Sequence, residues 1–214
     1  NLGGAFDARG DTDISAGRDV TIASVEERVK QARGTKYLNE QVTQYGATVS
    51  TARDLTVSAG RDLAAIASRL DAGRDLALAA GGDMTLASAA NEEHFYSKTK
   101  TGGKKVIRQE DHVHQQATEV SANGDVTLSA NNNLVLSASR VAAGGEAYLV
   151  AGEQLALLAA EDVDYSLYDM KKKGSWGSKK TQRDETTSVR NVGSSITTGS
   201  DLTLVSGGDQ LYQK

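Results

Sequence analysis

The chain has no cysteine and no proline among its 214 residues, and only 5% of its residues are aromatic. Without cysteine it cannot form disulfides, iron–sulfur clusters or thiolate zinc sites. Without proline, its turns must depend on glycine, asparagine and aspartate, which tolerate positive φ, and glycine is abundant at 22 residues. Because aromatic residues are scarce, any core has to be built from small and aliphatic side chains.

Strong positive charge and long apolar runs are also missing. The net charge of −4 argues against a nucleic-acid partner bound by bulk electrostatics. No run approaches the roughly 18 apolar residues of a membrane-spanning helix. The chain starts at Asn1 without methionine or signal peptide and ends at Lys214, so we expect a piece of a longer array. In such a piece, missing targeting signals carry no information about the parent protein.

What the sequence does contain is a short period nested in a longer one. Between residues 52 and 90, four short alternating apolar runs each follow an Arg-Asp or Gly-Asp pair, at Asp54, Asp62, Asp75 and Asp83. The spacings are 8, 13 and 8, so one unit has 21 residues. The rhythm returns 71 positions later, at Asp125, Asn133, Glu146 and Gln154. Nested fixed periods of this kind indicate a repeat architecture.

Period-2 alternation in each unit predicts short strands with one aliphatic face. One such strand cannot be stable alone, but stacked 21-residue coils would pair strands in parallel and align the aliphatic side chains into a core. We therefore predict an all-β parallel β-helix as a single body over residues 1–214. A globular sandwich is the alternative, although it gives no reason for the repeated spacing. The residues predicted to point inward include Leu55, Leu63, Leu76, Val126, Leu134 and Leu155.

Three polar segments interrupt the rhythm without shifting it, at about 25–48, 91–119 and 161–196. They are predicted to protrude from the coils as inserts. Residues 96–108, with Gly102-Gly103 at the centre, have the pattern of a β-hairpin, and residues 173–178 suit the tip of a second one. In the first segment a short helix competes with a hairpin, because residues 27–33 are good helix formers.

Repeats of the form A-G-x-D-[LV]-x-[LV]-x-A, interrupted by hydrophilic inserts, resemble filamentous haemagglutinin repeats. The matching segments are 16–24, 59–67, 72–80, 80–88, 122–130 and 199–206. The resemblance covers nearly the whole chain and implies a right-handed β-helix in a large bacterial exoprotein of a two-partner secretion system. Such proteins are adhesins, haemolysins and toxin-delivering proteins of contact-dependent growth inhibition, and the insert-bearing class is similar to the toxin-proximal repeat region. The family offers no catalytic residues and no cofactor within these repeats.

That resemblance also implies partners and a location. The partners are an outer-membrane transporter, a target-cell surface or outer membrane, flanking repeats and a C-terminal toxin domain. The location is secreted, at the bacterial cell surface.

The main enzyme alternative is a β-helical polysaccharide lyase or hydrolase, which needs paired carboxylates in a cleft and aromatic platforms for sugars. Because the acids here recur once per turn and Trp176 is the only tryptophan, we expect no enzyme.

Three short motifs suggest sites, and each has a plainer interpretation. Arg9-Gly10-Asp11 spells an adhesion tripeptide, but Asp11 lies eight positions before Asp19, as a repeat turn requires. Gly-Gly-Asp at 81–83 and 207–209 is similar to calcium-binding nonapeptide repeats, whose nine-residue spacing is absent. His112 and His114 have the spacing of a zinc-binding pair, with His94, Glu or Asp as a third ligand, but a solvated hairpin strand is favoured. We therefore expect no metal.

Two inserts carry clusters of cations with no acid between them, flanked by acids on their stems. The residues are Lys98, Lys100, Lys104, Lys105 and Arg108 in one, and Lys171, Lys172, Lys173, Lys179, Lys180 and Arg183 around Trp176 in the other. Because the inserts start 71 residues apart, both tips should leave the same face as a basic ladder about 10 Å apart. Solubility and edge protection explain such lysines. Contact with anionic lipopolysaccharide, glycan or membrane is the alternative. A stalk segment and a binding module are therefore the two functions that the sequence leaves open.

Overall fold

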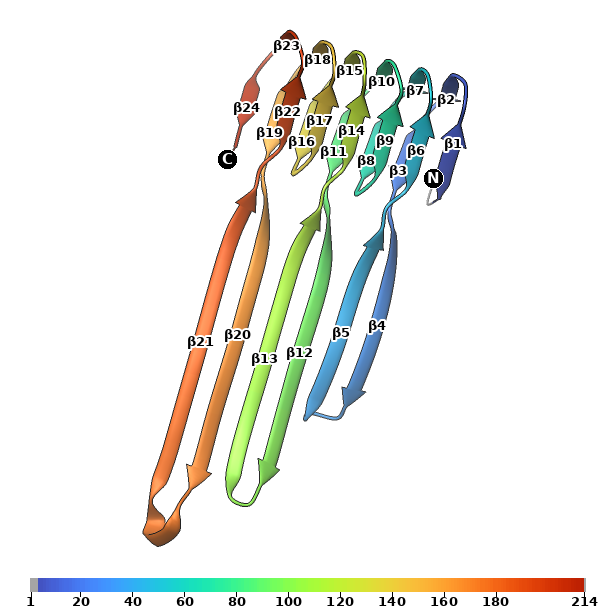
Figure 1. The fold of residues 1–214 in the computed structure, drawn as a ribbon. Helices are drawn as coiled ribbons and strands as arrows, with labels where there is room; N and C mark the ends of the chain where they lie inside the picture. Colours follow the sequence, from blue (N-terminus) through green and yellow to red (C-terminus); the bar gives the residue numbers. More distant parts are fainter. Residues whose placement is uncertain (1–3, 214) are drawn as a thin grey trace.

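The coils form three parallel sheets, and each coil contributes one strand to each sheet in the computed structural model, which describes residues 4–213 (Figure 1). The first sheet contains β1 (Ala5–Ala8), β6 (Thr48–Thr51), β9 (Arg69–Ala72), β14 (Glu119–Ala122), β17 (Arg140–Ala143) and β22 (Ser195–Thr198). The second contains β2 (Thr12–Ala16), β7 (Leu55–Ala59), β10 (Leu76–Ala80), β15 (Val126–Ala130), β18 (Ala147–Ala151) and β23 (Leu202–Ser206). The third contains β3 (Val20–Ala23), β8 (Leu63–Ile66), β11 (Met84–Ala87), β16 (Leu134–Ser137), β19 (Leu155–Leu158) and β24 (Gln210–Tyr212).

This arrangement confirms the predicted parallel β-helix. The register also follows the predicted unit, because Leu55 pairs with Leu76, which lies 21 residues later, and Leu63 pairs with Met84. The first and last residues, Asn1 and Lys214, lie outside the described part. Within residues 4–213, the structure contains no helix long and apolar enough to span a membrane.

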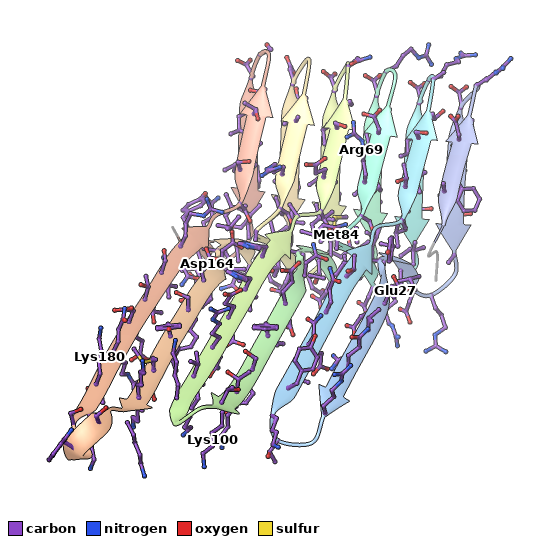
Figure 2. The ribbon with its side chains drawn as sticks, turned by 60° about the horizontal axis from the view of Figure 1, so that its bottom comes forward. Glu27, Arg69, Met84, Lys100, Asp164 and Lys180 are labelled. Carbon is purple, nitrogen blue, oxygen red and sulfur yellow. The ribbon has the colours of Figure 1, made fainter. Side chains whose placement is uncertain are left out.

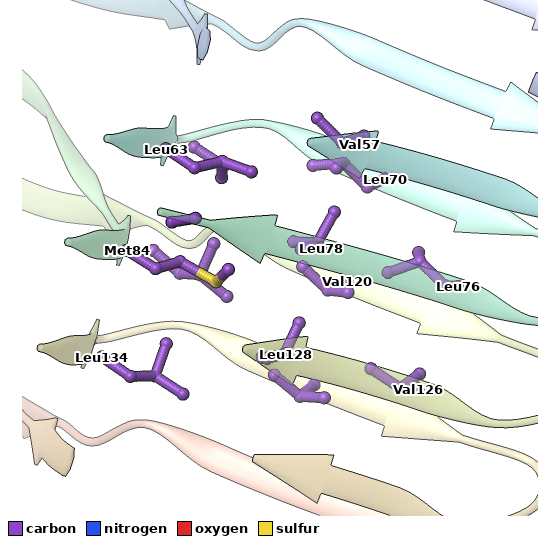
Figure 3. Close-up of a cluster of buried hydrophobic side chains, with 14 of the residues drawn as sticks. Val57, Leu63, Leu70, Leu76, Leu78, Met84, Val120, Val126, Leu128 and Leu134 are labelled. Carbon is purple, nitrogen blue, oxygen red and sulfur yellow. The ribbon is translucent and has the colours of Figure 1, made fainter. Parts of the chain in front are cut away.

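The core is a column of aliphatic side chains that runs through the coils (Figure 3). Strands of the second sheet bury alternate residues, as in β7, where Leu55 and Val57 are fully buried and Thr56 is exposed. The six residues predicted to point inward are all at most 1% exposed. Burial of each such side chain contributes about 1.5–3 kcal/mol, and this alternation is the physical reason for the coil.

The three inserts are β-hairpins, and together they form a fourth sheet of six antiparallel strands (Figure 1). The strands are β4 (Val25–Arg33) with β5 (Tyr37–Tyr45), β12 (Ala89–Thr101) with β13 (Lys104–Gln116), and β20 (Ala160–Lys173) with β21 (Lys179–Val192). A short 3-10 turn, η1 (Ser175–Gly177), closes the third hairpin. The first insert is therefore a hairpin and not the competing helix.

The hairpins join because their width matches the spacing of the coils from which they leave. A hairpin follows the first, third and fifth coils, after β3, β11 and β19. Two stacked coils span about the same distance as two paired strands, since both use the inter-strand spacing of about 4.8 Å. Neighbouring hairpins therefore meet edge to edge, and β5 pairs with β12 while β13 pairs with β20.

Candidate functional site

The tip of the hairpin sheet gathers the cations of the second and third hairpins across the seam between them. In the register of β12, β13 and β20, Lys100 lies opposite Lys105, and Lys105 lies opposite Lys171. Directly opposed residues in an antiparallel sheet point to the same face, so these three side chains form one row. A second row, on the other face, contains Lys104, Lys172 and Lys180. Figure 2 shows Lys100 and Lys180 near the ends of their hairpins.

Lysines also surround a small hollow at this tip. Its volume is about 340 Å³, and it is lined by Gly103, Thr181 and seven lysines, Lys100, Lys105, Lys171, Lys172, Lys173, Lys179 and Lys180. Like charges so close together repel one another, and an anion placed among them would relieve that repulsion. Two sequence-predicted clusters are thus one cluster in the folded chain.

Some of the predicted cations near the tip, namely Arg183, Arg108 and Lys171, already have partners within the chain. Arg183 donates to Glu185 at 2.8 Å, and this hydrogen bond raises the pKa of Arg183. Arg108 lies over the ring of Tyr168, with its guanidinium carbon 5.7 Å from the ring centre, which is within the range of cation–π contact. Nζ of Lys171 lies 4.0 Å from the carboxylate of Asp169. Lys98 and Lys100 remain exposed on β12, which pairs with β13, the strand of Arg108.

Trp176 occupies the end of the third hairpin and is completely exposed. Its backbone is left-handed, with φ 60° and ψ 33°, a conformation that a bulky residue rarely adopts. The turn Ser175–Gly177 thus holds an aromatic side chain in water beside lysines on both flanking strands. Tryptophan in such a place is suited to a boundary between water and an apolar phase.

Nearer the coils, on the part of β13 and β20 that we call the stem (residues 111–114 and 162–165), histidine and carboxylate side chains face one another. His112 on β13 lies opposite Asp164 on β20, and its Nδ1 is 2.7 Å from Oδ1 of that carboxylate. His114 reaches the same oxygen with Nε2 at 3.5 Å. The pair predicted from sequence therefore finds its carboxylate on a different hairpin. His94 takes no part, because it bonds Asp111 at 3.0 Å and Glu92 at 3.3 Å on the opposite face.

Asp162, on β20, is a buried acid, at 6% exposure. Burial by itself raises the pKa of Asp162, but hydrogen bonds from Arg190 and from the backbone N–H of Gln115 outweigh burial and lower the pKa overall. The two donors lie at 2.6 Å and 2.7 Å. Asp162 is therefore a fixed anion close to His114, with its Oδ2 3.9 Å from Nδ1 of that histidine.

The adhesion-type tripeptide at 9–11 is a repeat turn, as its plainer interpretation predicts. It lies between β1 and β2, and Oδ1 of Asp11 accepts a hydrogen bond from the backbone N–H of Asp54 at 3.2 Å. Arg53 forms an ion pair with the same carboxylate at 3.3 Å. The carboxylate of this motif thus bonds to the turn of the next coil.

Comparison with models of known protein families finds haemagglutinin repeats over the chain. A haemagglutinin repeat model matches residues 30–107 and 101–213, and a second haemagglutinin repeat model matches residues 1–29. No curated protein and no solved structure shows a significant match to the chain. Haemagglutinin repeats are typical of filamentous haemagglutinin-like exoproteins, which are secreted or surface-bound, and are generally structural. From its coils, its inserts and these matches, the chain belongs to the haemagglutinin repeat family.

Proposed function

We propose that this chain is a non-enzymatic stalk segment of a secreted bacterial surface exoprotein, which carries an adhesive or toxic domain to neighbouring cells. The observation that carries the proposal is the continuous core, in which each coil bonds to the coils before and after it. A body of this kind lengthens by adding coils without a new fold. Two-partner secretion through an outer-membrane transporter, flanking repeats and a C-terminal toxin domain fit this role.

If the chain is a stalk segment, the parent protein should tolerate the removal of whole coils but not a substitution that disrupts the core of the coils. Deletion of residues 89–159 joins Ser88 to Ala160, so that the third hairpin replaces the second and two coils are lost. In the parent exoprotein, cells carrying this deletion should still display the protein and deliver its domain on contact. Leu134→Asp buries an unpaired charge and should abolish both. Loss of delivery by the shortened protein, with normal display, would show that this segment does more than span distance.

A non-enzymatic role is tested with the purified chain. Incubation with polyuronides and with peptidoglycan should release no products, as measured by chromatography of the soluble fraction. Product release that a single carboxylate substitution abolishes would overturn the proposal and favour the lyase or hydrolase alternative.

The second candidate function is contact of the lysine tip with an anionic surface, such as lipopolysaccharide or an anionic membrane. What supports it is the single lysine cluster across the seam, next to the exposed Trp176. Each exposed contact would be weak and would fade with salt. Several contacts on one tip would add through effective concentration.

Binding to lipopolysaccharide and to anionic or neutral vesicles, at low and high salt, tests this function. Replacing Lys171, Lys172, Lys173, Lys179 and Lys180 with Gln should remove the salt-sensitive part of binding. A matched control removes five charges from the coils instead, at Arg53, Arg61, Arg69, Arg74 and Arg140. Equal binding by the two variants, or no binding by the parent chain, would leave edge protection as the role of the lysines.

A further inference from the structure

The stem of the hairpin sheet brings together three side chains whose ligand atoms all lie within 4.8 Å of one another: His112, His114 and Asp164. The two histidines are two positions apart on β13, so their rings lie on one face of the strand. The rings are nearly parallel, at 11°, with centroids 6.2 Å apart. Asp164 comes from β20 and faces them from the neighbouring hairpin.

Contrary to the expectation from sequence alone, we propose that these three residues bind a divalent transition-metal ion of the Zn²⁺ type, which links the second hairpin to the third. Imidazole nitrogen and carboxylate oxygen are ligands that such ions accept, whereas Ca²⁺ and Mg²⁺ prefer oxygen alone. Two histidines, one carboxylate and one water complete a tetrahedral coordination shell.

The distances suit a shared ion. Ligand atoms bound at about 2.0–2.2 Å in a tetrahedral shell lie roughly 3.4 Å from one another. In the structure, Oδ1 of Asp164 lies 2.7 Å from Nδ1 of His112 and 3.5 Å from Nε2 of His114. Small rotations of exposed side chains are enough to admit the ion, because the three side chains are 35%, 52% and 49% exposed in the order His112, His114, Asp164.

A second carboxylate lies close to one of the ligands. Oδ2 of Asp162 lies 3.9 Å from Nδ1 of His114, whose other ring nitrogen, Nε2, faces Asp164. Asp162 is buried and held by Arg190 and by the N–H of Gln115. Metal-bound histidines usually donate their second ring N–H to such a carboxylate, which fixes the ring and raises its basicity. At 3.9 Å the two groups are not hydrogen-bonded, and a small rotation of the exposed His114 ring on metal binding would bring Nδ1 to Asp162, which would then be the positioning residue of the site.

The ion would act on the seam between the hairpins, because its ligands come from both sides. Binding would favour the folded sheet over any form in which β13 and β20 separate. Glu93 lies on the same face of the sheet, because it pairs with His112 in the strand register.

Titration of the purified chain with ZnCl₂ by calorimetry tests the proposal, with thermal unfolding in parallel. We expect one saturable site and a higher unfolding midpoint with Zn²⁺. His112→Gln, His114→Gln and Asp164→Asn should each lose this binding and this shift. Asp162→Asn should weaken binding by about 10–100-fold, as other changes to such orienting groups do. His94→Gln is the matched control, since it removes a histidine from the opposite face of the same sheet and should bind Zn²⁺ as the parent does.

Co²⁺ gives an independent readout, because a tetrahedral site produces strong visible absorption that the three ligand variants should lack. Absence of saturable Zn²⁺ binding by the parent chain would overturn the proposal. Unchanged binding in His112→Gln and His114→Gln, with each variant folded by circular dichroism, would also overturn it. Loss of binding only in His94→Gln would overturn it as well, because that result would place the ion on the other face.

Discussion

The carboxylate of Asp75 accepts a hydrogen bond from the backbone N–H of Asp125, 2.9 Å away, although the two residues lie fifty positions apart. Asp125 in turn accepts from the N–H of Glu146 at 2.8 Å. The same contact links Asp62 with Asp83, at 3.0 Å. The recurrent acid of the sequence is therefore an acceptor that satisfies the turn of the next coil, and the second hairpin does not interrupt this ladder.

Replacing Asp75 with Ala should leave the N–H of Asp125 without its acceptor and lower the free energy of unfolding by about 0.5–1.5 kcal/mol. Asp75→Asn should cost much less, because Asn133 already serves as acceptor for Gln154 in the same ladder, at 3.3 Å. Urea denaturation followed by circular dichroism measures both variants. Equal losses in the two would show that charge, and not the acceptor oxygen, matters at this turn.

A second prediction concerns the glycines of the turns, which stack closely from one coil to the next. A methyl group added at Gly60 would overlap the carbonyl oxygen of Gly17 in the preceding coil, whereas a methyl group at Gly17 meets nothing within 4 Å. Gly60→Ala should therefore destabilise the chain by about 1–3 kcal/mol, as overpacking does. Gly17→Ala is the matched control and should be close to neutral in the same denaturation experiment. Equal stability of the two variants would contradict the tight stacking of these turns.

Periodicity was sufficient to predict the coils. Alternation within β7 and β10 and the 21-residue spacing of Leu55 and Leu76 define which side chains point inward and which strands pair. These are local and periodic properties of the chain. The 8-13-8 spacing of the turn residues likewise predicted where the turns lie, and the structure shows that their carboxylates accept hydrogen bonds from the next coil.

The hairpin sheet was not predictable in the same way. Each insert could be recognised as a hairpin, but the pairing of β13 with β20 depends on the match between hairpin width and coil spacing. As a result, two basic clusters merge into one, and His112 meets Asp164, which lies 52 residues away. The signal available in the sequence was the 71-residue offset, which places the inserts on alternate coils.

A third prediction compares a buried position of β16 with its outward-facing neighbour. Leu134 in β16 is fully buried, and its neighbour Val135 points outward and is partly exposed. Leu134→Ala should lower the free energy of unfolding by about 2–5 kcal/mol. Val135→Ala removes apolar atoms from the adjacent position outside the core and should cost clearly less. Amide hydrogen exchange resolves where the loss occurs, and faster exchange in the flanking strands β11 and β19 is expected only for the first variant.

The pH dependence of the hairpin sheet gives a fourth prediction, centred on His94. Its hydrogen bond to Asp111 raises the pKa of His94, burial lowers it to a smaller extent, and Glu92 adds to the rise. Glu40, which is opposite His94 on β5, is already paired with Lys30 and Arg28 at 3.0 Å each. The acids next to the imidazole therefore favour its charged form in the folded chain.

A pKa that is higher in the folded state stabilises the fold where histidine is protonated. This contribution should be complete below the unfolded pKa of about 6.5 and should disappear as the pH rises through the raised folded value. His94→Gln removes it, so the variant and the parent should differ in urea midpoint at low pH and converge at high pH. The side chain is 35% exposed, so the difference will be modest and will shrink with added salt. A difference that grows as the pH rises would mean that the neutral ring is the form stabilised by Asp111, and would contradict the charged pair.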